Sequence, residues 1–91
     1  MTRARRVDAN QTEIVEALRA AGALVHCTHT VGDGFPDLVA AIDGEVFLLE
    51  IKSPGGRLTK AEQRFHNVWC EYVRVVRSPM DALEALGLVP F

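Results

Sequence analysis

The segment FPDLVAAIDGEVFLLEIKS, residues 35–53, decides the fold of this chain. It contains two apolar stretches, 37–42 and 45–52, joined at Asp43-Gly44, and an Asp-Gly pair between such stretches is among the strongest short signals of a β-hairpin. This most apolar part of the chain nevertheless carries Asp37 near one end and Glu50 and Lys52 near the other. A buried carboxylate costs several kcal/mol unless a partner compensates for its lost hydration. We therefore expect these three charged side chains to lie close to one another or to another charged partner.

A two-residue turn fixes which residues of the hairpin face each other. Asp37 and Glu50 are equally far from the turn, so they are predicted to lie directly opposite one another. Side chains in that relation share a face, with Cβ atoms about 4.5–5.5 Å apart. Lys52 lies two residues beyond Glu50, and the pleat returns it to the same face. The remaining residues are apolar on both faces, which is typical of strands in the centre of a sheet.

Two carboxylates at this distance raise one pKa or bind a cation between them. Mg²⁺ or Mn²⁺ suits two carboxylate oxygens with a backbone carbonyl, and such an ion keeps several waters. The ion lowers the pKa of bound water and neutralises charge on a phosphate, and Lys52 beside it would stabilise the transition state. The alternative is a structural ion pair without metal, in which Lys52 bridges Asp37 and Glu50.

The whole chain has the size and composition of one globular domain. Of its 91 residues, 48% are hydrophobic and 24% are charged, which excludes a disordered chain. Residues 1–91 are therefore interpreted as a single domain, with residues 1–9 as a basic N-terminal arm. No apolar run is long enough for a membrane span or a signal peptide, so a cytoplasmic protein is expected.

Periodicity and turn signals place helices and strands around the hairpin in the order αβββαβα, an α/β class. Helices are predicted at 10–21, 58–71 and 79–87, and strands at 23–30, 37–42, 45–52 and 72–77. Thr59 and Glu62 form a capping box at the start of the second helix. The inward face of that helix should carry Phe65 and Trp69 into the core.

Basic residues gather in two places although the net charge is −2. One is the arm, with Arg3, Arg5 and Arg6, and the other contains Lys52, Arg57, Lys60 and Arg64. Such patches bind phosphates, and they also occur as ordinary solvated surface.

Pro36-Asp37 followed by Glu50-Ile51-Lys52 resembles the signature of PD-(D/E)XK nucleases. More closely, GFPDLVA, LLEIKS and LTKAEQRFH resemble the small stand-alone VRR-NUC nucleases of phages and bacteria, relatives in fold of Holliday-junction resolvases. The resemblance covers residues 10–76. It implies a restriction-endonuclease-like αβββαβ core with a mixed central sheet, followed here by a C-terminal helix.

The resemblance also implies roles for individual residues. Asp37 and Glu50 would bind the metal, with the Ile51 carbonyl as a third ligand, and Lys52 would be the catalytic lysine. Gln63 would complete the catalytic set by facing the metal or the scissile phosphate. Many relatives carry an acid in the first helix, where this chain has Gln11 with Glu13 and Glu16 nearby. The fourth metal contact and the number of metals therefore stay open.

The function expected from the resemblance is a Mg²⁺- or Mn²⁺-dependent, structure-selective DNA endonuclease acting on branched or junction DNA. Arg57, Lys60, Arg64 and the three arginines of the arm would contact phosphates, which position DNA without reading its sequence. Because cutting two strands requires two active sites, a homodimer is expected. The alternative, suggested by Gln11 and the low net charge, is a catalytically inactive DNA-binding module of the same fold.

Overall fold

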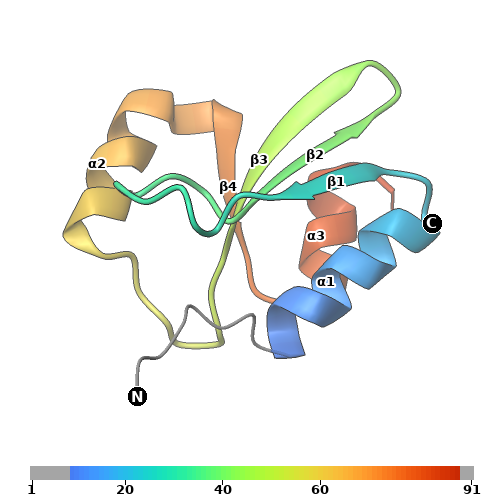
Figure 1. Ribbon diagram of the computed structural model, residues 1–91, viewed down its shortest axis with the longest axis horizontal. Coiled ribbons are helices and arrows are strands. Elements are labelled where there is room, and N and C mark those ends of the chain that lie inside the picture. The colour runs from blue at the N-terminus through green and yellow to red at the C-terminus, as the bar shows by residue number, and fades with distance from the viewer. Residues whose placement is uncertain (1–8, 89–91) are drawn as a thin grey trace.

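The computed structural model describes residues 9–88 and shows the predicted αβββαβα order (Figure 1). The elements are α1 (Ala9–Ala20), β1 (Leu24–Cys27), β2 (Leu38–Ile42), β3 (Glu45–Ile51), α2 (Lys60–Trp69), the short 3₁₀ helix η1 (Cys70–Tyr72), β4 (Val73–Val76) and α3 (Pro79–Ala85). Arg3, Arg5 and Arg6 lie outside the described residues. Within residues 9–88, no helix has the length and apolar character that crossing a membrane requires.

The four strands form one mixed sheet in the order β1-β2-β3-β4. The first three strands are antiparallel neighbours, and β4 runs parallel to β3. The chain therefore belongs to the α/β class, and β2 and β3 are the central strands, as their apolar faces predicted.

The hairpin register is the one predicted from Asp43-Gly44. Leu38 pairs with Leu49, and Ile42 pairs with Glu45 directly before and after the turn. Both turn residues have positive φ, 53° at Asp43 and 80° at Gly44. Two successive positive φ angles are the mark of the type I′ turn that joins strands through two residues.

One face of the sheet is covered by α1 and α3, which contact each other and lie side by side in Figure 1. The core on this face contains Ile14 and Leu18 of α1, Leu38 and Ala40 of β2, Leu49 of β3, Val76 of β4 and Ala82 of α3. The alternate residues of β2 and β3 point to the other face, where exposure falls from 69% at Val46, next to the hairpin turn, to 1% at Glu50, near the far end of β3.

Helix α2 lies at the opposite end of the molecule from α1 and α3 (Figure 1). None of its residues is fully buried. The prediction that Trp69 enters the core is wrong, because its side chain is 43% exposed, and Phe65 is half-buried. These rings instead form a row with Phe35 and Tyr72, with centroids 5.4, 5.1 and 6.4 Å apart in the order Phe35, Phe65, Trp69, Tyr72. The periodicity of α2 therefore marks an aromatic surface and not a buried stripe.

Candidate functional site

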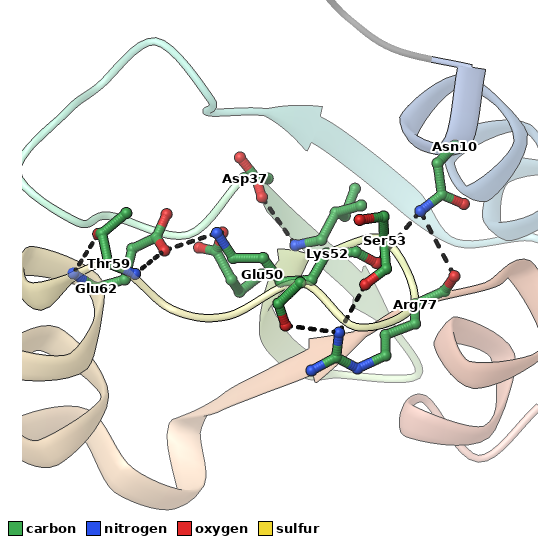
Figure 2. A network of polar contacts seen from close by, with 10 residues as sticks. Asn10, Asp37, Glu50, Lys52, Ser53, Thr59, Glu62 and Arg77 are labelled. Carbon is green, nitrogen blue, oxygen red and sulfur yellow. Dashed lines mark hydrogen bonds and ion pairs between the residues drawn. The ribbon is translucent and has the colours of Figure 1, made fainter.

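Asp37 and Glu50 come together where the two strands of the hairpin end. The Leu38–Leu49 pair continues to Asp37 and Glu50 as the next facing residues. Oδ2 of Asp37 accepts a hydrogen bond from the backbone N–H of Ile51 at 2.8 Å, which holds the side chain against the end of β3 (Figure 2). Asp37 is also a side-chain hydrogen-bond partner of Glu50, so the two carboxyl groups are adjacent, as the register predicted.

Glu50 is the most unusual of these side chains because it is 1% exposed. Its Oε1 atom is buried and receives no hydrogen bond from the described residues. Burial, and then the hydrogen bond and the charge of Asp37, raise the pKa of Glu50 to about 9. At neutral pH the buried carboxyl is therefore protonated and donates a hydrogen bond to Asp37, whereas its ionised form lacks a compensating partner at Oε1.

Lys52 returns to the same face, and its amine lies between two acids. Nζ is 3.6 Å from Oε2 of Glu50 and 2.7 Å from Oε1 of Glu62 in α2. Burial lowers the pKa of Lys52, but the hydrogen bond and charge of Glu62, followed by the charges of Glu50 and Asp37, leave it above its usual value. In the metal-free ion pair that the sequence left open, Lys52 would bridge Asp37 and Glu50. The closest partner of the amine is instead Glu62.

Glu62 is the residue of this site that the sequence did not predict. The capping box with Thr59 was predicted correctly, since Oε1 of Glu62 accepts the Thr59 N–H at 2.8 Å and Thr59 Oγ1 accepts the Glu62 N–H at 3.2 Å. Burial raises the pKa of Glu62, but the hydrogen bonds from Lys52 and from the Thr59 N–H outweigh it and leave the pKa lowered. A capping box indicates where a helix starts but not which other element the start of the helix contacts. Nothing in the sequence near Glu62 therefore predicted its ion pair with Lys52.

Gln63, the predicted catalytic glutamine, lies next to Glu62 and is exposed. Successive residues are about 100° apart around a helix, so the two side chains leave α2 in different directions. Glu62 is the one that reaches Lys52. A role for Gln63 stays a prediction.

Gln11, the predicted site residue of the first helix, is buried in the first turn of α1. Its Nε2 atom lies 3.3 Å from Nδ1 of His29, in the loop after β1. Glu13 and Glu16 are exposed. The neighbouring Asn10 reaches the end of β3, where its Nδ2 atom donates to the carbonyl of Lys52 at 3.4 Å. The start of α1 therefore contacts the main chain of the site.

The loop between Lys52 and α2 is held by Arg77, which follows β4 (Figure 2). Nη1 of Arg77 donates to the carbonyls of Ser53 and Gly56 at 2.7 and 2.9 Å. Asn10 also donates to the Arg77 carbonyl at 3.5 Å. This network fixes the segment that sets the distance between Lys52 and Glu62.

The predicted phosphate-binding residues within the described chain are all exposed. Arg57 lies in the loop before α2, and Lys60 and Arg64 lie four residues apart on the helix. Residues at that spacing share a helix face, so both cations are available to a polyanion from one direction.

The donor set fits a hard divalent cation. Asp37 and Glu50 offer carboxylate oxygens, and the buried Oε1 of Glu50, which receives no hydrogen bond from the described residues, marks a place where a cation would compensate for burial. The described residues contain no group of three or more His, Cys, Asp or Glu side chains arranged to hold a metal. Two carboxylates with a backbone carbonyl and water is the kind of coordination that Mg²⁺ accepts, because it keeps several waters.

Comparison of the chain with protein-family models, with curated proteins and with solved structures finds no match in any of the three. The function proposed below is therefore argued from the geometry of the site and from the motifs of the sequence.

Proposed function

We propose that this protein is a Mg²⁺- or Mn²⁺-dependent endodeoxyribonuclease of the VRR-NUC type within the PD-(D/E)XK nucleases. One observation carries the proposal: adjacent carboxyl groups of Asp37 and Glu50 lie beside the amine of Lys52, and Glu50 is buried with one oxygen that no described residue supplies with a hydrogen bond. The αβββαβα order around a mixed sheet supports the corresponding restriction-endonuclease-like fold.

Asp37, Glu50 and the Ile51 carbonyl hold the metal in this proposal, while Gln11 and Gln63 are the remaining candidates for contacts to the metal or the phosphate. A bound Mg²⁺ or Mn²⁺ ion supplies an activated water and neutralises charge that develops on the phosphate. Lys52 contributes a fixed positive charge next to the reacting phosphate, where electrostatic stabilisation is most effective in a water-poor site.

DNA binds through its phosphates in this proposal, because exposed cations are the available contacts. Lys60 and Arg64 lie on α2, and Arg57 lies in the loop directly before that helix. Phosphate contacts position DNA without reading bases, so the structure of branched or junction DNA selects the target. Cutting both strands requires a second active site, which a homodimer supplies.

The proposal is tested by incubating branched DNA with the protein and Mn²⁺. Asp37→Ala and Lys52→Ala are expected to lower cleavage by about a hundredfold or more, since removing one electrostatic stabiliser costs about 10²–10³ in kcat. Asp43→Asn is the matched control, because it removes a carboxylate from the same hairpin while Asn-Gly still favours the turn. Cleavage by either alanine variant at the parent rate contradicts the mechanism.

The inactive DNA-binding module is separated from the nuclease by two titrations. A nuclease binds Mn²⁺ in calorimetry, and Asp37→Ala abolishes that binding. Salt-sensitive DNA binding without any Mn²⁺ binding would instead support the inactive module.

A further inference from the structure

A single carboxylate oxygen connects the start of α2 to the lysine of the site. Oε1 of Glu62 accepts the Thr59 N–H at 2.8 Å and lies 2.7 Å from Nζ of Lys52 (Figure 2). The Lys52 and Glu62 side chains are each 17% exposed, so water and salt screen this ion pair less than an ordinary surface pair. The contact is therefore strong enough to determine where the amine lies.

The position of that amine matters for Glu50. Nζ of Lys52 is 3.6 Å from Glu50 Oε2, at the edge of ion-pair distance, because the amine is drawn toward Glu62. Without Glu62, Glu50 is the one acid left within ion-pair distance of the amine among the described residues, and the amine would move onto Glu50 when that carboxyl ionises, as metal binding requires. A lysine in direct contact with Glu50 would compete with a cation for the same carboxylate, since the two positive charges repel.

The position of Glu62 is itself set by the fold. Within the capping box, the backbone N–H of Thr59 holds the Glu62 carboxylate, while the Thr59 hydroxyl caps the backbone N–H of Glu62. The backbone of Gly34, in the loop before β2, lies directly against the backbone of Ala61, next to Glu62. The start of α2 is thus packed against the loop that leads to Asp37, and Glu62 has little freedom to follow Lys52.

We propose that Glu62 is a positioning residue that holds the Lys52 amine away from Glu50, leaving Glu50 available to the metal and the amine available to the phosphate. This inference rests on the proposed function. In this inference Glu62 changes the affinity for the metal by holding Lys52 in place. It does not do so by attracting the metal ion directly with its own charge.

The test is a double-mutant cycle on Mn²⁺ binding, measured by calorimetry with the full chain. Glu62→Gln is the informative variant, because a capping box accepts glutamine and the helix start is retained while the charge is lost. Its Mn²⁺ affinity is expected to fall about tenfold relative to the parent. In a Lys52→Met background, where no amine remains to be held, Glu62→Gln should leave the affinity unchanged.

Each other outcome decides against the inference. An equal loss of affinity in the presence and absence of Lys52 means that Glu62 acts by its own charge, and no loss in either background means that it does not act. Absence of Mn²⁺ binding by the parent protein overturns the proposed function together with this inference, whereas parent binding that Glu62→Gln does not alter overturns the inference alone.

Thr59→Ala is the matched control for helix stability. It removes the hydroxyl that caps the Glu62 N–H but keeps the backbone N–H that binds Glu62 Oε1. The variant should lower Tm and leave Mn²⁺ affinity at the parent value. If Thr59→Ala lowered Mn²⁺ affinity as much as Glu62→Gln does, the loss would come from destabilising the start of α2 and not from releasing the Lys52 amine.

Discussion

Glu50 is the residue from which we expect a pH dependence of stability. Its pKa in the folded protein is about 9, against an ordinary value of 4.5, so between these values the folded chain holds a proton that the unfolded chain releases. Stability linked to this group is fully present below the ordinary pKa and is lost as the pH rises through about 9. Without metal, the fold should therefore weaken across the neutral and mildly alkaline range.

Replacing Glu50 with glutamine should remove this loss, because the amide stays neutral at every pH. We expect Glu50→Gln to be more stable than the parent at pH 8 in the presence of a chelator, and similar to it at pH 4.5. Between these two pH values, the free energy of unfolding of the parent should fall by at most about 1.4 kcal/mol per pH unit. Urea unfolding at the two pH values measures the difference, and an identical pH dependence of parent and variant would contradict it.

Metal binding at the same residue should release protons. A cation favours the ionised form of Glu50, so binding at pH 7 is expected to expel about one proton and to strengthen by up to about tenfold per pH unit below the pKa. Calorimetry in two buffers with different ionisation enthalpies counts the protons released. A binding heat that does not depend on the buffer would place the metal away from Glu50.

At the scale of elements, Gly34 allows the start of α2 to lie close against the loop before β2. Its φ is +79°, and a Cβ atom there would collide with the backbone carbonyl of Ala61. Glycine therefore permits both the turn and the close approach of the helix to the loop that carries Asp37. Gly32 has a similar φ of +90°, but a Cβ there would meet nothing within 4 Å.

Substituting these two glycines distinguishes the cost of backbone strain from the cost of losing the contact with α2. Gly32→Ala should cost about 1 kcal/mol, the ordinary penalty for a side chain at positive φ. Gly34→Ala should cost about 1–3 kcal/mol more, because the added methyl displaces the start of α2 and with it the Lys52–Glu62 ion pair. Denaturant unfolding measures the free energy of unfolding that each variant loses. Equal losses would show that α2 does not depend on this contact.

Local rules predicted elements well and contacts between elements poorly. Asp43-Gly44 fixed the hairpin register, and Thr59 with Glu62 marked the start of α2, because turns and caps are formed by residues close in sequence. The partner of Glu62 and the exposure of Trp69 depend on how α2 sits against the sheet. That arrangement is set by the loop that Arg77 anchors and by the approach to Gly34, which periodicity does not report.

At the scale of the whole molecule, one face of the sheet is covered by α1 and α3, and the other, the open face, is exposed near the hairpin turn although Glu50 on it is buried. Leu24, Ala41 and Val46 are cross-strand neighbours on the open face, where Leu24 is 74% and Val46 69% exposed. Tyr72, the last ring of the aromatic row, lines a hollow shared with Val46 and Phe47. Exposed apolar surface of this kind is typical of protein interfaces.

The charges that line this hollow favour a second copy of the chain as the partner. Glu45, Glu71 and Arg74 all line the hollow, so it offers both signs of charge next to the exposed apolar side chains of Val46 and Tyr72. A twofold interface brings the same patch of each copy together, which requires a patch that complements itself. The two acids make the hollow unsuitable for phosphates, which are left to Arg57, Lys60 and Arg64.

Val46→Glu should therefore convert the proposed homodimer into a monomer, because a carboxylate added to the exposed apolar patch of each copy would be buried in the interface without a partner. Sedimentation at micromolar concentration measures the change. Met80→Glu is the control, since Met80 is 53% exposed on α3, away from the open face, and its variant should remain dimeric.

In the nuclease assay, the Val46→Glu monomer should nick one strand of branched DNA and lose paired cuts. A parent protein that sediments as a monomer, or a Val46→Glu variant that sediments as a dimer, would place any self-association elsewhere on the molecule.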